Sequence, residues 1–419
     1  MVSSHTAPIP RTPSTPHASG DEGAAMIARQ GALSMLVALP DFVFGAVYMT
    51  VLLGDGFSPA LIGVEMMGST LLSTVVEIPS GDLGDRFGQR RIATLGLAIW
   101  GLSLIVFPAL HRDSPWLLFA VLLVWTVGQA LYSGAPLALT VNAIARNHVK
   151  RRGLAIRVSM IAKWVGAAAG AAVSLVLLRP IGETRAIAAS GALLVILAFW
   201  LRFGWPESRV SSTALQQHGM LSRLRSSWSC SLWPLLTVTA ETSMLLSVML
   251  FVWQPLVADD AHLPASANGV VLLAMTAIAA AGAWLARFHR ERRIWDVVAA
   301  LLFVGMTFVT MGLLHDPIVT YLALGMLEIS TSYIATAIGT EYHMVFPDES
   351  RNLLSSVFSA AAGVAMGLSD FGFGLVWDSL GMNRALIVAG CCGLAFALIA
   401  VATSSWTRNL AQRHEHMHT

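Results

Sequence analysis

Four charged residues lie far inside long apolar stretches of the sequence: Asp41, Lys163, Glu241 and Glu328. A charge at the centre of a bilayer costs about 2.5 to 3.5 kcal/mol, and residues that bear this cost commonly serve transport or proton relay. A carboxyl group withdrawn from water favours its neutral form, so it can take up and release a proton. We therefore expect the proton-coupling groups among these four residues, with Asp41 and Glu328 as the first candidates. The alternative is a static pair of Lys163 with Asp41 or Glu328.

Polar and aromatic residues at helical spacing accompany these charges. Trp125, Gln129 and Tyr132 share one face of the segment 116–144, because they are spaced by four and three residues. A buried amide such as that of Gln129 needs a partner or a cavity. The residues that we expect to line a substrate cavity are Tyr48, Trp125, Gln129, Tyr132, Thr331 and Ser332. For each aromatic residue alone, ordinary packing is the alternative interpretation.

The elements that carry these residues are predicted to be membrane-spanning helices. The chain has 419 residues, of which 55% are hydrophobic and 12% charged, with a mean hydropathy of +0.67. Soluble proteins average about 25% charged residues, so this composition excludes a soluble enzyme. Segments of about 20 apolar residues cross a bilayer as helices. Twelve are expected, at 31–53, 61–80, 92–110, 116–144, 153–178, 186–203, 232–257, 268–286, 294–314, 318–345, 352–377 and 385–402.

The basic residues predict how these spans are oriented. Cytoplasmic loops are enriched in Lys and Arg. With a cytoplasmic N terminus, most of the 26 basic residues fall on the cytoplasmic side, and only Arg112, Arg179, Arg185 and Arg384 fall on the other. The sequence therefore predicts a multi-pass protein of the plasma (inner) membrane with both termini in the cytoplasm.

The two halves of the chain resemble each other. Arg86-Phe87, after the second segment, recurs as Arg287-Phe288 after the eighth, and Gln129 has its counterpart in Glu328. Repeats of this kind indicate a duplicated unit, and two such units enclosing a midplane site are typical of rocking transporters. The predicted organisation is a disordered cytoplasmic tail at 1–29, a six-helix bundle at 30–203, a cytoplasmic linker at 204–230, a second bundle at 231–404 and a cytoplasmic tail at 405–419.

The loop predicted between the second and third spans carries a recognisable motif, because residues 81–91 read GDLGDRFGQRR. This run resembles the signature loop of the major facilitator superfamily, Gly-x-Leu-(Ala/Gly)-Asp-Arg-x-Gly followed by two basic residues. Gln89 takes the place of the first of those basic residues. Glycines allow tight turns, and an aspartate suits the positive end of a neighbouring helix.

The resemblance implies an all-α membrane protein with twelve helices in two pseudo-symmetric six-helix bundles. It also implies a cavity lined by spans one, four, seven and ten, which include Asp41, Glu241 and Glu328. A conformational latch is implied between the motif and the start of span eleven, near Arg351 and Asn352. The latch residues would be Gly81, Gly84, Asp85, Arg86, Gly88, Arg90 and Arg91. The alternative for the arginines is that they only fix the orientation of the spans in the membrane.

The function expected from these features is secondary active transport by alternating access. Three deep carboxyl groups against one lysine favour a cationic or neutral amphipathic cargo. We expect proton-coupled export of small compounds such as drugs or antibiotics. Two features of the family's drug antiporters are missing, since span four lacks an arginine and Ala171 stands where a proline is expected in span five. An uptake permease for a metabolite and a non-transporting sensor are the alternatives.

Other function classes find no support in the sequence. It contains no Gly-x-x-x-x-Gly-Lys-Ser/Thr loop, so ATP-driven transport is not expected, and neither is enzymatic activity. No cofactor, metal or nucleic acid is expected. The predicted partners are a small-molecule substrate, protons and the lipid bilayer, and the predicted state is a monomer.

Overall fold

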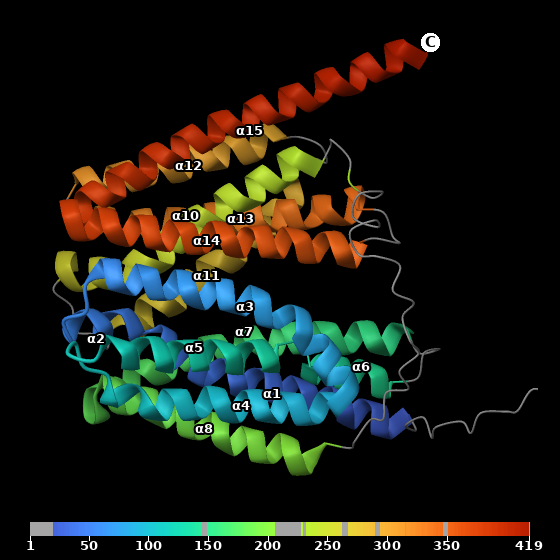
Figure 1. Ribbon diagram of the computed structural model, residues 1–419, viewed down its shortest axis with the longest axis vertical. Coiled ribbons are helices and arrows are strands. Elements are labelled where there is room, and N and C mark those ends of the chain that lie inside the picture. Colours follow the sequence, from blue (N-terminus) through green and yellow to red (C-terminus); the bar gives the residue numbers. More distant parts are fainter. Residues whose placement is uncertain are drawn as a thin grey trace, which may run out of the picture.

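The computed structural model describes residues 20–133, 135–144, 149–205, 228, 232–261, 267–289, 294–314, 316–346 and 351–418. These residues form helices and short connections, and twelve helical segments are long and apolar enough to cross a membrane. The predicted number of spans is therefore confirmed. The spans lie side by side in two bundles, with the N-terminal half below the C-terminal half in Figure 1.

Each half supplies six spans. In the N-terminal half they are formed by α1 (Gly20–Gly45) with α2 (Tyr48–Gly54), α3 (Pro59–Phe87), α4 (Gln89–Val106), α5 (Pro115–Tyr132) with α6 (Ala135–Ala143), α7 (Val149–Ile181) and α8 (Glu183–Gly204). In the C-terminal half they are α10 (Leu232–Ala261), α11 (Asn268–Leu285), α12 (Ile294–Leu313), α13 (Pro317–Val345), α14 (Arg351–Leu380) and α15 (Met382–His418). Short 3-10 turns follow α4 at Phe107–Ala109 and α11 at Ala286–Phe288.

The molecule has two ends that are used below as reference points. The terminal face is the end at which α1 begins and α15 ends, on the right in Figure 1. The opposite face carries the short turns after α2, α7 and α14, which contain Gly56, Gly182 and Gly381. These three glycines have φ values of 87°, 80° and 86°, a conformation that side chains disfavour, so each turn depends on its glycine.

Close glycine contacts repeat in the two bundles. In the N-terminal half, a Cβ built on Gly101 of α4 would lie 2.6 Å from the carbonyl oxygen of Gly191 on α8. In the C-terminal half, a Cβ on Gly390 of α15 would lie 2.6 Å from the carbonyl oxygen of Gly305 on α12. Small residues let membrane helices approach closely, since packing there relies on van der Waals contact. The shared contact supports the duplicated architecture expected from the sequence.

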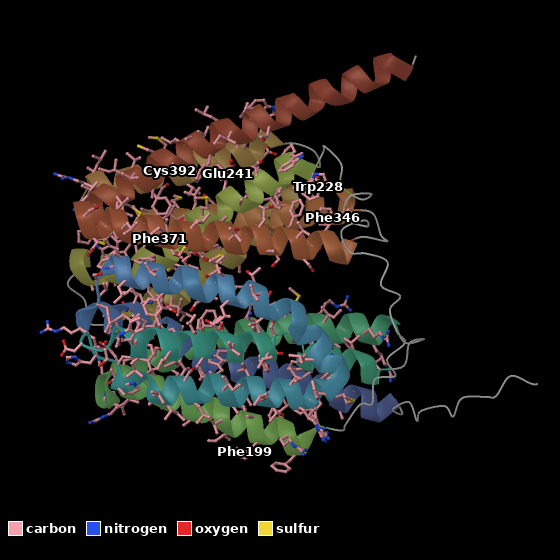
Figure 2. All side chains as sticks on the ribbon, viewed as in Figure 1. Phe199, Trp228, Glu241, Phe346, Phe371 and Cys392 are labelled. Carbon is pink, nitrogen blue, oxygen red and sulfur yellow. The ribbon has the colours of Figure 1, made fainter. Side chains whose placement is uncertain are left out.

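The outer surface of both bundles is rich in exposed apolar side chains, as expected for contact with lipid. Phe199 on α8 is 61% exposed and points away from the bundle in Figure 2. Leu398 on α15 and Val176 on α7 are 69% and 71% exposed.

The predicted beginning and end of the helical region need correction. Residues 20–29, expected in a disordered tail, are helical, because Met26 and Ile27 are buried and Ile27 packs against Ile144 and Ala155.

Two further boundaries differ from expectation. The helix α15 continues through the predicted tail as far as His418. The predicted loop at 81–86 is helical, because α3 runs on to Phe87 and the turn is confined to Gly88, with φ 96°. The Gly88 amide still donates to the carbonyl of Gly84 at 3.0 Å, and the positive φ of Gly88 then ends the helix. Residues 206–227 and 229–231, most of the predicted linker, lie outside the described part of the chain.

Candidate functional site

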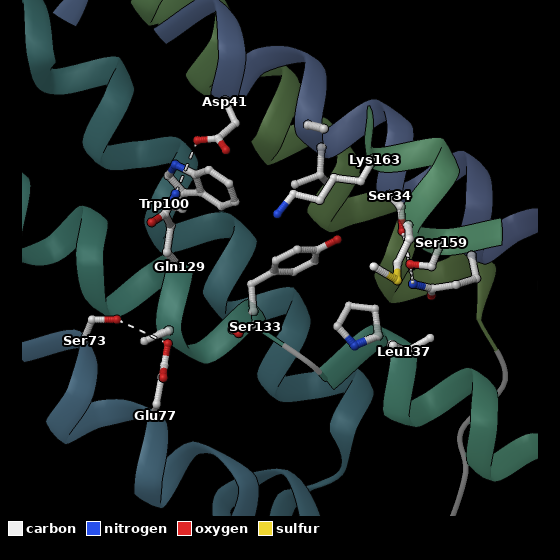
Figure 3. A pocket seen from close by; sticks show the side chains of 17 residues that line it. Ser34, Asp41, Ser73, Glu77, Trp100, Gln129, Ser133, Leu137, Ser159 and Lys163 are labelled. Atoms are coloured by element: carbon white, nitrogen blue, oxygen red, sulfur yellow. Dashed lines mark hydrogen bonds between the residues drawn. The ribbon is translucent and has the colours of Figure 1, made fainter. Parts of the chain in front are cut away.

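A cavity of about 440 Å³ lies inside the N-terminal bundle, in the part nearer the terminal face (Figure 3). It is formed by helices α1, α3, α4, α5, α6 and α7, with Ser133 between α5 and α6. Its lining residues are Gln30, Ser34, Val37, Ala38, Asp41, Ser73, Glu77, Trp100, Gln129, Ala130, Tyr132, Ser133, Pro136, Leu137, Ser159, Met160 and Lys163. The mixture of polar groups with apolar walls suits a small amphipathic ligand.

The charged centre of the cavity consists of Asp41, Gln129 and Lys163. The Gln129 Nε2 donates a hydrogen bond of 3.3 Å to Asp41 Oδ1, drawn as a dashed line in Figure 3. Lys163 extends from α7 into the same space, close enough for Coulombic attraction to Asp41. Asp41 follows Pro40 near the C-terminal end of α1, where the proline removes one helical hydrogen bond. This centre can bind a proton or a cationic group at Asp41.

A second polar group lies nearer the terminal face. Gln30 is only 2% exposed, and its Nε2 donates to Ser34 and Ser159, both at 3.3 Å. The two serine hydroxyls are 2.7 Å apart, and Thr140 donates to Gln30 Oε1 at 3.2 Å. These bonds join α1, α6 and α7. Sequence reasoning missed the group, although the i, i+4 spacing of Gln30 and Ser34 in an apolar helix was a usable signal.

Two lining residues of α3 were also not predicted. Ser73 donates a hydrogen bond of 3.4 Å to Glu77 Oε1, and both side chains line the cavity. Glu77 thus adds a second carboxylate to the walls. Its i, i+4 spacing from Ser73, near the end of an apolar segment, was the available signal in the sequence.

The cavity brings together four of the predicted residues: Asp41, Gln129, Tyr132 and Lys163. Tyr48 and Trp125 do not line it. Both pack against Phe44, with ring centroids 5.3 Å and 5.7 Å apart, so their observed contacts fit the packing alternative. Glu241, Glu328, Thr331 and Ser332 belong to α10 and α13 in the other bundle.

The predicted residues of the C-terminal bundle do not form a comparable cluster among the described contacts. Glu241 is 5% exposed and lies inside its bundle in Figure 2, and its Oε2 has no hydrogen-bond partner among the described residues. Thr331 is buried and donates to its own helix at the Leu327 carbonyl, 2.8 Å away. Lys163 lies within electrostatic reach of Asp41, whereas Glu328 belongs to α13 in the other bundle.

The two bundles are held together near the opposite face by Gln254 of α10 and Asn268 of α11. The chain between α1 and α2 breaks the helix, which leaves backbone groups without helical partners. Gln254 Nε2 donates to the Gly45 carbonyl at 2.7 Å, and its Oε1 accepts from the amides of Met49 and Thr50 at 3.1 and 3.2 Å. Asn268 donates to the Ala46 carbonyl at 3.0 Å. We call these contacts the amide clamp.

The motif at 81–91 is described only in part. Arg90 donates from Nη1 to the carbonyl of Trp205 at 2.5 Å, which joins the start of α4 to the end of α8. Gly84 faces the side chain of Gln89, where a Cβ would lie 2.5 Å from Oε1. The side chains of Asp85, Arg86, Arg351 and Asn352 lie outside the described part of the chain, so the latch stays a prediction.

Metal ligands do not cluster in the described residues, which contain no group of three or more His, Cys, Asp or Glu side chains able to hold an ion. Comparison with known families gives one match, because residues 31–369 fit the model described as Major Facilitator Superfamily. No curated protein sequence matches the chain significantly.

Solved structures with the same fold include several transporters. A bacterial homologue of the human lysosomal transporter Spinster, inward-facing and unoccupied, is 15% identical with a TM-score of 0.74, over 93% of this chain and 99% of that one. Its occupied inward-facing form is 16% identical with the same TM-score, over 94% and 98%. The nucleoside transporter NupG, as a D323A mutant, is 11% identical with a TM-score of 0.73, over 90% and 99%.

Proposed function

Because the chain belongs to the major facilitator superfamily and is a multi-pass membrane transporter, we propose that it exports small amphipathic compounds in exchange for protons. The observation that carries this proposal is the cavity in which Asp41 meets Gln129 and Lys163. A buried carboxyl group beside a cation and an amide can alternate between a protonated and an ionised form at modest cost.

The exchange follows from competition at Asp41. When Asp41 is ionised, it attracts Lys163 or the cationic group of a cargo. When it is protonated, that attraction disappears and the cargo is released. A ligand shifts the conformational equilibrium only through its different affinity for the two states, so proton and cargo must occupy the cavity in turn. The apolar walls near Val37, Leu137 and Met160 accept the rest of the cargo.

The direction of export rests on the proposed orientation. Arg29, Arg90, Arg91, Arg151 and Arg152 lie towards the terminal face, which we assign to the cytoplasm by the positive-inside rule. The cavity lies nearer this face, and the amide clamp joins the bundles near the other. These features support an inward-facing state with both termini cytoplasmic. The proposal further takes the protein as a monomer in the plasma membrane, with the motif at 81–91 as its cytoplasmic latch.

The first test uses purified protein in liposomes with an imposed pH gradient. A growth-inhibition panel, with and without the gene, identifies a cargo for the assay. We expect Asp41→Asn to abolish proton-driven flux while expression persists, because the amide cannot exchange a proton. A cationic cargo should also bind more weakly, since the negative charge that attracts it is gone. Asp378→Asn is the matched control, since it removes an exposed carboxylate from α14.

Two outcomes would contradict the proposal. Unchanged proton-driven flux in the Asp41→Asn variant would remove Asp41 from the coupling mechanism. Accumulation of the labelled cargo by intact cells, instead of its efflux from loaded cells, would replace export with uptake.

A further inference from the structure

Two buried carboxyl groups outside the cavity come from opposite bundles. Glu65 on α3 is 3% exposed, and Asp370 on α14 is 2% exposed. Each accepts a hydrogen bond from a serine of its own half, Glu65 from Ser69 and Asp370 from Ser247. Both lie in the parts of their helices nearer the opposite face. Neither belongs to the set of residues that line the cavity.

The helices that carry them are in direct backbone contact. A Cβ built on Gly63 of α3 would lie 2.5 Å from the carbonyl oxygen of Asp370. A Cβ on Gly374 of α14 would lie 2.5 Å from the carbonyl oxygen of Pro59. In Figure 2, Phe371, next to Asp370 in sequence, is seen where the two bundles meet. The crossing therefore leaves little space for water around the two carboxyl groups.

The charges around this pair are all of one kind. Glu65 and Asp370 interact electrostatically with each other, and both interact with the Tyr48 hydroxyl. Tyr48 itself donates to Met66 Sδ at 3.5 Å. From α10, the neighbouring groups are Ser247 and the carbonyl of Met244, which do not titrate in the physiological range. None of the described Lys, Arg or His residues pairs with either carboxyl group.

Ionisation of both groups would leave two negative charges buried at the bundle interface without a cation. Such an arrangement is strongly unfavourable, because desolvation and mutual repulsion both oppose it. Separation of α3 and α14 would admit water and remove both costs. We propose that Glu65 and Asp370 form a shared proton site. This site must hold a proton for the two bundles to come together and close the molecule at the opposite face.

The proton balance of this step is simple. On closure, one carboxylate takes a proton from water on the opposite face and becomes a carboxylic acid. On opening, the acid returns that proton to the same water. Low pH therefore favours the state in which the opposite face is closed, and high pH favours the state in which it is open. The inference goes beyond the proposed function, because it concerns the contact between the bundles and depends on neither the cargo nor Asp41.

The experiment measures the distance between spin labels on the opposite face by pulsed electron paramagnetic resonance. The labels occupy Asp113→Cys and Ser379→Cys, both at exposed positions, after Cys230, Cys391 and Cys392 have been replaced by Ala. In the protein with native carboxyls, we expect the ratio of closed to open molecules to fall by up to about tenfold for each unit by which the pH is raised. In the Glu65→Gln and Asp370→Asn variants, we expect the opposite face to remain closed across the whole pH range.

Controls separate this site from general charge effects and from the cavity. Glu183→Gln removes a carboxylate at the start of α8, near the same face, and should keep the native pH response. Asp41→Asn should also keep it while losing proton-driven flux, so failure of the two proposals is seen in different measurements. Size-exclusion chromatography checks that each variant is folded, and either single variant suffices for the test. A native pH response in either Glu65→Gln or Asp370→Asn, in a variant that is folded, would overturn the proposal, and so would a response to Na⁺ at constant pH instead.

Discussion

Lys163 is the one cation among the described residues that line the cavity, and it attracts the carboxylate of Asp41. We expect Lys163→Met to slow proton-driven exchange by at least about tenfold, since a loss of about 1.4 kcal/mol of attraction corresponds to that factor. In this variant the ionised form of Asp41 loses the attraction of Lys163 and becomes less favourable. The step that forms it, release of the proton from Asp41, is therefore slowed. Flux in liposomes with and without a pH gradient measures the effect, and exchange without a gradient should be less affected.

Arg157→Met is the control for this residue. Arg157 lies on the same helix, α7, and is exposed outside the cavity. Loss of proton-driven exchange in both variants would mean that α7 needs positive charge in general, and the specific role of Lys163 would be wrong.

At the scale of elements, the break between α1 and α2 is stabilised from the other half of the chain. The Gln254 side chain binds one carbonyl and two amides of the break. A buried polar group without a partner costs about 1 to 3 kcal/mol. We expect Gln254→Leu to lower the ratio of closed to open molecules by about fivefold or more, because opening lets water bind these groups. The same spin-label distance, at constant pH, measures this change.

Ser243→Ala is the matched control on α10, because the Ser243 hydroxyl bonds only the Thr239 carbonyl of its own helix in the described structure. It should leave the distance distribution unchanged. An unchanged distribution in Gln254→Leu would show that the amide clamp does not hold the opposite face closed.

At the scale of the whole molecule, the cavity and the clamp lie towards different faces. This asymmetry predicts which side of the membrane reaches the cavity. A cysteine at Ser73, in a background without native cysteines, should react quickly with a membrane-impermeant thiol reagent in inverted vesicles and slowly in intact cells, provided that the terminal face is cytoplasmic. The expected difference reflects the closed contact of α3 with α14 and of α2 with α10.

A cysteine at Ser379, exposed on the opposite face, should show the reverse order of reaction. Equal reaction rates at Ser73 from both sides would mean that the described state is rare in the membrane. Reversal of both patterns would mean that the orientation assigned from the basic residues is wrong.

The sequence alone determined the number of spans, the family and part of the cavity. These features are local: apolar runs of sufficient length, the run at 81–91, and polar residues such as Asp41, Gln129 and Lys163 within apolar segments. Each polar residue is conspicuous because an unpaired one would be costly in a membrane. The duplication was also visible, and the glycine turns at Gly182 and Gly381 agree with it.

Only the tertiary structure decided which of these residues meet. It places Lys163 and Asp41 in one cavity, leaves Tyr48 and Trp125 in packing contacts, and brings Gln254 to a helix break more than 200 residues away. It also brings the segment of α3 that carries Glu65 against Asp370 of α14, across the two bundles. The physical reason is that hydropathy reports the burial of one residue at a time. The partners that make burial tolerable come from distant helices, and their identity depends on how those helices cross.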